Sequence, residues 1–128
     1  MEGVIDTNVL VSAIVKEDVN HKKARSILEK MKKWYIPGIV FHEFVWFLKS
    51  QNLDPKIAES VLNNEKTEFV PILEEDISFS LRNSKNLRNY NDYLILSISI
   101  RKKRMLVSFD TELRKSCKRF KVKVYPKL

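Results

Sequence analysis

The chain has 128 residues, and its 24 Lys and Arg outnumber its 16 Asp and Glu to give a formal net charge of +8. This length predicts a single domain over 1–128, and the charge favours an anionic partner such as nucleic acid or an acidic protein. Cys117 is the only cysteine, which excludes an intrachain disulfide and a cysteine-based zinc site. No apolar run approaches the roughly 18 residues of a membrane span and no signal peptide is recognisable, so we expect a cytoplasmic protein that contacts no membrane.

Short apolar runs alternate with helix-length segments along the chain. A buried strand is predicted at 3–6, and helices at 7–17 and 21–33 follow it. A second strand is predicted at 34–37, and 38–51 has the length and periodicity of a helix. Beyond these we expect, in order, a helix at about 55–64, a strand at 68–72, helices at 74–85 and 91–104, a strand at 105–109, a helix at 110–117 and a strand at 122–125.

This alternation predicts a mostly parallel sheet with helices on both faces. Ligands of such sheets bind outside the carboxyl ends of the strands. Asp6 stands where the first strand ends, and Asp110 stands where the strand at 105–109 ends. Each also has an ordinary explanation, because an Asp before a helix caps its first N–H groups. Asp92 lies in the first helical turn, where a negative charge complements the helix dipole.

Glu43 is the carboxylate that a helix end does not explain. It is predicted in the middle of a helix, where neither capping nor the dipole stabilises a negative charge. An ionised carboxylate among apolar side chains costs several kcal/mol unless a partner compensates it. An exposed Glu at the rim of a wide apolar face is the ordinary alternative. Its neighbours three and four positions away are all apolar: Ile39, Val40, Trp46 and Phe47.

A single site would explain all four carboxylates if the predicted fold brings them together. Asp6, Asp92 and Asp110 sit at junctions that meet at one edge of a parallel sheet, and a packed helix can direct Glu43 to the same place. Carboxylates a few ångströms apart repel one another unless a cation compensates them. Hard oxygen ligands favour Mg²⁺ or Mn²⁺ over zinc. Such ions, in pairs about 3.5–4 Å apart, support phosphodiester hydrolysis.

Four segments, in order, resemble the motifs of the PIN domain family. "VIDTNVLVSAI" (4–14) resembles its opening motif, in which an Asp is followed by Thr or Ser and then by Asn or Ser. "FHEFVW" (41–46) is similar to the second motif, a helical Glu. "NDYLILSISI" (91–100) is similar to the third, an Asp that starts an apolar helix. "LVSFDTEL" (106–113) resembles the fourth, a strand that ends in Thr or Ser, one further residue and an Asp. The set covers essentially the whole chain.

The resemblance implies a three-layer α/β/α sandwich with a mostly parallel five-stranded sheet. It also implies a ribonuclease that depends on Mg²⁺ or Mn²⁺. Carried over by position, the catalytic and metal-binding carboxylates are Asp6, Glu43, Asp92 and Asp110, and the residues that support them by hydrogen bonds are Asn8 and Ser108.

A lone short PIN domain resembles the toxin of VapBC-type toxin–antitoxin pairs, which is usually a homodimer inhibited by a small antitoxin. The implied partners are therefore an RNA substrate, a VapB-type antitoxin and a second copy of the chain. The sequence departs from the family at Ser97, where a small residue such as Ala is common. Many relatives carry a further acid after the fourth motif. Glu112 is available for that role, but we expect it to be exposed.

Two other functions fit parts of the pattern. In a non-enzymatic RNA-binding or scaffold module, the aspartates would serve only as helix caps. Magnesium-dependent RNA cleavage that EDTA abolishes would separate this alternative from the nuclease. A phosphohydrolase of the haloacid dehalogenase type needs Asp-x-Asp, and Asn8 stands in place of the second acid. We therefore expect a metal-dependent endoribonuclease.

Overall fold

The computed structural model describes residues 1–127, apart from the side chain of Arg88; Leu128, the end of the predicted domain, lies outside the described residues. A five-stranded sheet with strand order β3-β2-β1-β4-β5 forms its centre, and all its neighbouring strands are parallel. The strands are β1 (Glu2–Ile5), β2 (Lys33–Pro37), β3 (Thr67–Val70), β4 (Met105–Val107) and β5 (Val124–Tyr125).

Helices fill the connections between the strands, as the alternation of segments predicted. A short 3₁₀ turn at Leu87–Asn89 precedes the sixth helix and was not predicted. The α-helices are α1 (Thr7–Ile14), α2 (His21–Lys30), α3 (Gly38–Ser50), α4 (Lys56–Leu62), α5 (Glu74–Asn83), α6 (Tyr90–Lys102) and α7 (Thr111–Arg119).

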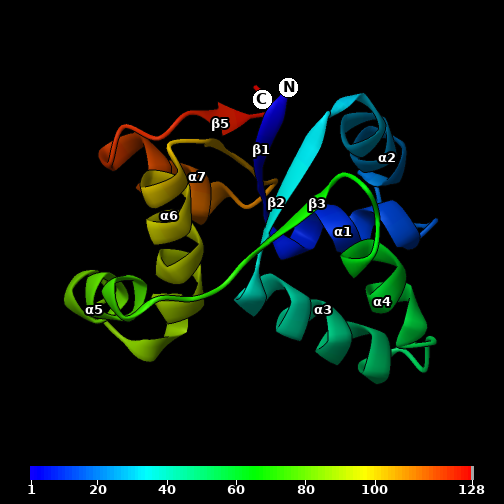
Figure 1. Ribbon diagram of the computed structural model, residues 1–128, viewed down its shortest axis with the longest axis horizontal. Coiled ribbons are helices and arrows are strands. Elements are labelled where there is room, and N and C mark those ends of the chain that lie inside the picture. Colours follow the sequence, from blue (N-terminus) through cyan, green and yellow to red (C-terminus); the bar gives the residue numbers. More distant parts are fainter. Residues whose placement is uncertain (128) are drawn as a thin grey trace.

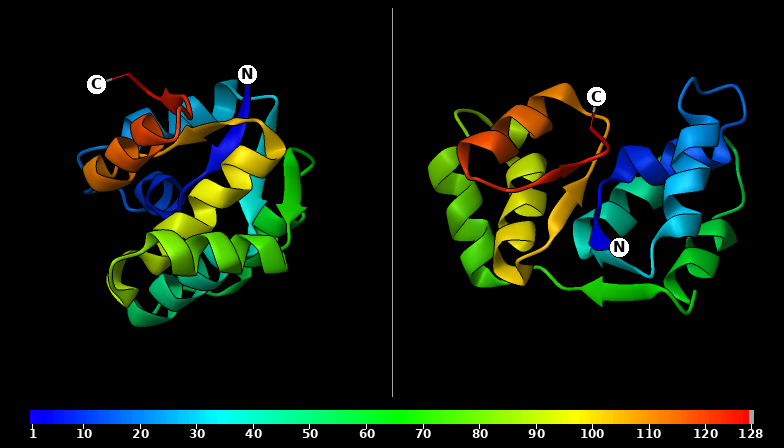
Figure 2. Two further views of the ribbon diagram at one scale, coloured as in Figure 1. Left: turned by 90° about the vertical axis from the view of Figure 1, so that its left-hand side faces the viewer. Right: turned by 90° about the horizontal axis from the view of Figure 1, so that it is seen from above.

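The helices form two layers, one on each face of the sheet. Helices α1 to α4 lie together on one side of the strands, and α5 to α7 lie on the other (Figure 1). The right-hand view of Figure 2 shows the same separation. The side changes because the chain moves from β1 outward to β3 and then crosses back to β4, and crossovers between parallel strands keep a right-handed sense. The predicted α/β/α sandwich with a parallel five-stranded sheet is confirmed.

The two largest errors in helix ends are at α1 and α2, which were each predicted three residues too long at the carboxyl end. Helix α1 ends at Ile14 rather than at 17, because Val15 adopts an extended conformation and its N–H bonds to the carbonyl of Val11. Helix α2 ends at Lys30 rather than at 33, because Lys33 already pairs with Glu2 in the sheet. At the end of α2 the polar residues beyond Met31 continue the helical pattern, and pairing in the sheet ends the helix.

The central strands set the packing of the core. Val4 and Ile5 of β1 are fully buried, as are the β4 residues Leu106 and Val107. Gly3 keeps β1 close to β4, because a Cβ there would approach Val107 Cγ2 to 3.0 Å. None of the helices in residues 1–127 combines the length and the apolar composition that crossing a bilayer requires.

Candidate metal centre

The carboxyl ends of two adjacent strands define the site. Strands β1 and β4 pair in parallel, with Ile5 opposite Val107, and the N–H of Asp6 extends the ladder to the carbonyl of Val107 at 2.9 Å. The chain leaves β1 toward one face of the sheet and leaves β4 toward the other. The polar residues that follow both strands therefore stand at the switch point where parallel sheets bind ligands.

Asp6 is both a helix cap and a buried acid of this site. Its carboxylate accepts hydrogen bonds from the N–H of Thr7 at 2.7 Å and from the hydroxyl of Ser108 at 2.6 Å. Burial leaves the residue 6% exposed and raises the pKa of its carboxyl to about 6, although these two hydrogen bonds act in the opposite direction. The nearby carboxylates of Glu43 and Asp110 raise the pKa further.

Glu43 reaches the same place from the middle of α3. One of its oxygens accepts a hydrogen bond from the hydroxyl of Thr7, and the other accepts one from the amide of Asn91 at 3.1 Å. The carboxylate is thus held by residues from α1 and α6, far from it in sequence. Sequence reasoning missed both donors, since Thr7 matched a motif only as a small polar residue and Asn91 carried no signal.

Asp92 is the acid with the most strongly raised pKa in the site. It lies in the first turn of α6, where the helix dipole favours a negative charge. Burial nevertheless raises the pKa of its carboxyl to about 7, and repulsion from Asp6, Asp110 and Glu43 contributes in the same direction. Burial, with the repulsion from the other carboxylates added to it, therefore outweighs the dipole.

Asp110 caps α7 and also faces the other acids. Its Oδ1 accepts hydrogen bonds from the N–H groups of Glu112 at 2.8 Å and Leu113 at 3.2 Å. Its charge is close enough to raise the pKa values of both Asp6 and Asp92. The capping explanation and the site explanation thus hold together for this residue, as they do for Asp6.

Ser108 links the two strand ends. Its hydroxyl donates to Asp6 and accepts a hydrogen bond from the N–H of Asp110 at 3.0 Å. The side chain of Asn8 contacts the same hydroxyl at 3.5 Å and accepts from the N–H of Phe109 at 3.3 Å. Ser108 therefore bonds directly to an acid, whereas Asn8 acts through Ser108.

The four acids line one cleft of about 330 Å³ together with Thr7, Asn8, Val11 and Phe47. As the side chains stand, no group of three or more His, Cys, Asp or Glu within residues 1–127 is arranged to hold a metal ion. The donor set nevertheless consists of carboxylate oxygens, the ligands that Mg²⁺ and Mn²⁺ prefer. Glu112 is exposed and does not line the cleft, as expected.

Comparison with known proteins decides the family. Residues 3–118 match the PIN domain family. The chain belongs to this family. No curated protein matches it. Among solved structures, this PIN domain is similar to the VapC20 toxin of Mycobacterium tuberculosis, which is described as cleaving the sarcin-ricin loop. Their identity is 11% and the TM-score is 0.78, with 91% of this chain and 95% of that one covered.

Two solved complexes also share the fold. A toxin–antitoxin complex from Klebsiella pneumoniae contains a chain 18% identical to this PIN domain, with a TM-score of 0.69 over 88% of this chain and 89% of that one. VapBC2 from Rickettsia felis, bound to a DNA fragment from its promoter, contains a chain 22% identical, with a TM-score of 0.64 over 97% of each chain. The predicted resemblance to VapC-type PIN domains is confirmed.

The departure at Ser97 has a local explanation in this PIN domain. Its hydroxyl donates to Oδ1 of Asp76 at 2.7 Å, and Asp76 is fully buried between α5 and α6. Arg101, one turn further along α6, pairs with the same carboxylate at 2.8 Å. A hydroxyl therefore replaces a smaller side chain here because the neighbouring helix carries a buried acid.

Proposed function

We propose that this PIN domain is a metal-dependent endoribonuclease that hydrolyses RNA phosphodiester bonds as the toxin of a type II toxin–antitoxin system. The observation that carries the proposal is the convergence of Asp6, Glu43, Asp92 and Asp110, from four different elements, on one cleft at the switch point of the sheet. Acids with raised pKa values in a cleft are typical of functional sites. Capping accounts for Asp6 and Asp110, but it gives no reason for Glu43 to join them.

The residues of the cleft fit a divalent cation. Repulsion between the carboxylates contributes to the raised pKa values of Asp6 and Asp92, and a cation among them would remove that repulsion. Asp6, Glu43, Asp92 and Asp110 would hold it. When bound, Mg²⁺ or Mn²⁺ supplies positive charge that stabilises the charge developing on the scissile phosphate.

The chain itself positions and orients these acids. Thr7 and Asn91 fix both oxygens of Glu43, so the carboxylate does not depend on the ion for its orientation. Ser108 donates to Asp6 and so directs its second oxygen away from solvent. Val11 and Phe47 form the apolar part of the cleft wall. Such preorganisation is what hydrolysis requires of the protein.

The proposed partners follow from the solved complexes and the surface. The similar chains in the Klebsiella and Rickettsia structures belong to toxin–antitoxin complexes, which supports a small VapB-type antitoxin as partner.

Val45 and Trp46 on α3 expose apolar surface, which supports a homodimer. We place this ribonuclease in the cytoplasm. Sedimentation at micromolar concentration is expected to show a dimer; a 15.1 kDa species alone would contradict it.

Metal-dependent cleavage tests the proposed function. The purified chain is incubated with RNA in Mg²⁺, in Mn²⁺ and in EDTA, and products are resolved by gel electrophoresis. We expect internal cleavage in either metal and none in EDTA, with activity returning when metal is added in excess. RNA that binds but stays intact in both metals would instead support the non-enzymatic RNA-binding or scaffold module.

A further inference from the structure

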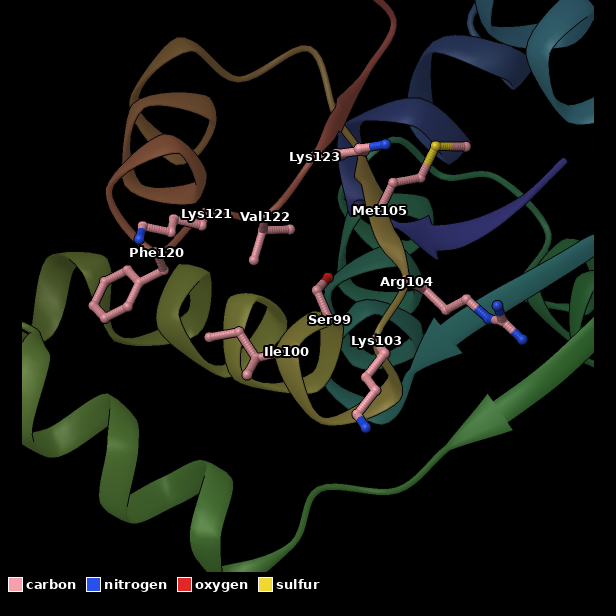
Figure 3. A pocket seen from close by; sticks show the side chains of 9 residues that line it. All are labelled: Ser99, Ile100, Lys103, Arg104, Met105, Phe120, Lys121, Val122 and Lys123. Atoms are coloured by element: carbon pink, nitrogen blue, oxygen red, sulfur yellow. The ribbon is translucent and has the colours of Figure 1, made fainter.

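A second hollow lies at the edge of the sheet opposite the acidic cleft. It has a volume of about 320 Å³ and opens where α6 and α7 end and where β4 and β5 begin. Figure 3 shows Ile100, Val122, Phe120 and Met105 forming much of its apolar lining. Because α6 runs from Asp92 in the cleft to Ser99 and Ile100 in this hollow, the two sites are roughly 11 Å apart along the helix at about 1.5 Å per residue.

Basic side chains surround this hollow. Lys103, Lys121 and Lys123 line it, and none of them forms an ion pair within residues 1–127. Arg104 also lines it but pairs with Glu2 at 3.4 Å. No carboxylate is among the lining residues that the structure describes. Their side chains point in different directions around the opening (Figure 3), and a lysine stem is flexible enough to turn over it.

Ser99 supplies an unused hydrogen-bonding group at the same place. Its side chain is directed at the hollow between Ile100 and Val122 (Figure 3). The residue is 1% exposed, and its hydroxyl has no hydrogen-bond partner in the described part of the chain. Buried hydroxyls are nearly always paired, so an unpaired one next to a cationic hollow points to an acceptor that enters from outside.

Two lysines occupy backbone positions that normally favour glycine. Lys103 has φ 55° and Lys121 has φ 60°. Each follows a helix whose end is closed by a bond of the same kind. At α6 the N–H of Arg104 reaches the carbonyl of Ser99, and at α7 the N–H of Val122 reaches that of Cys117. Glycine is the usual residue at this position of the motif. Lysine at both positions gives each of the two helix ends a cation beside the hollow.

We propose that this hollow binds a nucleoside phosphate, with the phosphate on the lysines and the uncharged ring system on the apolar floor. Lysine binds phosphate as a compact charge with several donors. The volume is at the lower end of the roughly 300–1,000 Å³ of small-ligand sites. The ligand is either a free nucleotide or the phosphorylated end of an RNA strand.

The site is independent of the acidic cleft, so its test needs no RNA cleavage. Adenosine 5′-monophosphate, inorganic phosphate and adenosine are each titrated calorimetrically into the full chain in EDTA at low salt. We expect the monophosphate to bind, inorganic phosphate to bind more weakly and adenosine not to bind detectably. A short RNA with a 5′-phosphate, compared with the same RNA ending in a 5′-hydroxyl, then distinguishes a strand end from a free nucleotide.

Glycine substitution removes the charges without straining the backbone. Lys103→Gly combined with Lys121→Gly should fold at least as well as the wild type, because glycine adopts positive φ freely. It should weaken monophosphate binding by about tenfold or more and lower the salt dependence of binding. The matched control is Lys22→Gln with Lys23→Gln on α2, which loses the same charge and should bind within about twofold of wild type.

Three results would overturn the proposal. One is the absence of binding by every phosphate-bearing probe. Another is an equal loss in the glycine variant and the α2 control, which would mean that only net charge matters. The third is displacement of the monophosphate by an oligoglutamate peptide at lower concentration, which would assign the hollow to an acidic protein. In NMR spectra, the monophosphate should change the chemical shifts of the backbone amides at 99–104 and 120–123 in the wild type. Loss of these changes in the glycine variant would support the site.

Discussion

Two sites with buried carboxylates lie against the same helix, and they differ in how the charge is compensated. Near the start of α6, Asp92 shares a cleft with Asp6, Glu43 and Asp110, and the pKa values of Asp6 and Asp92 are raised. Further along α6, the carboxylate of Asp76 contacts the helix, and its pKa is lowered.

Compensation explains the lowered pKa of Asp76. Burial alone would raise it, but hydrogen bonds from Arg101, the N–H of Leu73 and the hydroxyl of Ser97 more than offset burial. The cleft has no such cation on the chain among its lining residues. One site is therefore complete as a structural ion pair, whereas under the proposed function the other is compensated by a cation from solution.

The largest expected effect is on catalysis by the cleft. Asp92→Asn removes one carboxylate without adding bulk, and we expect RNA cleavage to fall by about 10²–10⁴-fold, since metal catalysis contributes several kcal/mol. The control is Glu75→Gln, an exposed acid outside the cleft, which should cleave at the wild-type rate. Cleavage by Asp92→Asn at a rate close to that of the control would remove Asp92 from the site.

Breaking the structural pair should affect stability instead. Arg101→Ala leaves Asp76 buried without its cation, and we expect the free energy of unfolding to fall by about 3–5 kcal/mol. Urea denaturation at neutral pH measures the change. Arg82→Ala, on the exposed side of α5, serves as control and should cost no more than about 0.5 kcal/mol. A similarly small cost for Arg101→Ala would mean that the two sites do not differ as described.

The pH dependence of stability should have opposite signs at the two sites. In the cleft the folded-state pKa values are about 6 and about 7, above the unfolded value. The folded state therefore favours the protonated forms of these two acids. Their contribution to the free energy of unfolding of the metal-free protein is present in full below about pH 4 and is lost as the pH rises through 6 and 7. For Asp76 the lowered pKa gives stability that is present above about pH 4 and lost on further acidification.

Urea denaturation in EDTA at pH 5 and pH 7.5 tests this sign. We expect wild type to be less stable at pH 7.5 by about 1–2 kcal/mol, after allowing for solvent screening of Asp92. Asp92→Asn should show a smaller difference. A metal-free wild type that becomes more stable between these pH values would contradict the assignment of crowded acids to the cleft.

The smallest effect is expected at the hydroxyl of Ser97, which donates a hydrogen bond to Asp76. Ser97→Ala removes one hydrogen bond to the buried carboxylate but leaves Arg101 in place, so we expect a loss of about 1 kcal/mol. Ser60→Ala, an exposed serine on α4, is the control. Stabilisation by Ser97→Ala would show that Arg101 alone satisfies the acid and that the hydroxyl only occupies space.

Local patterns predicted the order and type of the main elements and the placement of Asp6 and Asp110. Those acids follow apolar strands directly, and strand ends meet at one edge of a parallel sheet. Glu43 was identifiable because it conflicts with its apolar neighbours. That argument was only partly right, since Trp46 proved to be 66% exposed and Glu43 is held by hydrogen bonds rather than by apolar packing alone.

Contacts between residues distant in sequence were beyond that reasoning. Asn91 contacts Glu43 across 48 positions, and Ser97 contacts Asp76 across 21. Each partner is an ordinary polar residue in its own segment, so no local pattern marks it. Asp76 itself lies in the acidic first turn of α5, a position where exposure is the usual expectation. Its burial became visible only once α5 and α6 were packed together.

Thermal melting in EDTA and in Mn²⁺ tests most directly the central claim that the crowded acids of the cleft bind a divalent cation. Asp92→Asn is the best variant, because Asp6 and Asp110 also cap helices and Asp92 accepts none of the capping bonds seen there. Wild type should gain about 2.7 kcal/mol when Mn²⁺ exceeds its Kd by about 100-fold. Asp92→Asn should melt higher than wild type in EDTA and gain little from Mn²⁺. A wild type that Mn²⁺ does not stabilise, with Asp92→Asn melting earlier in EDTA, would contradict the account.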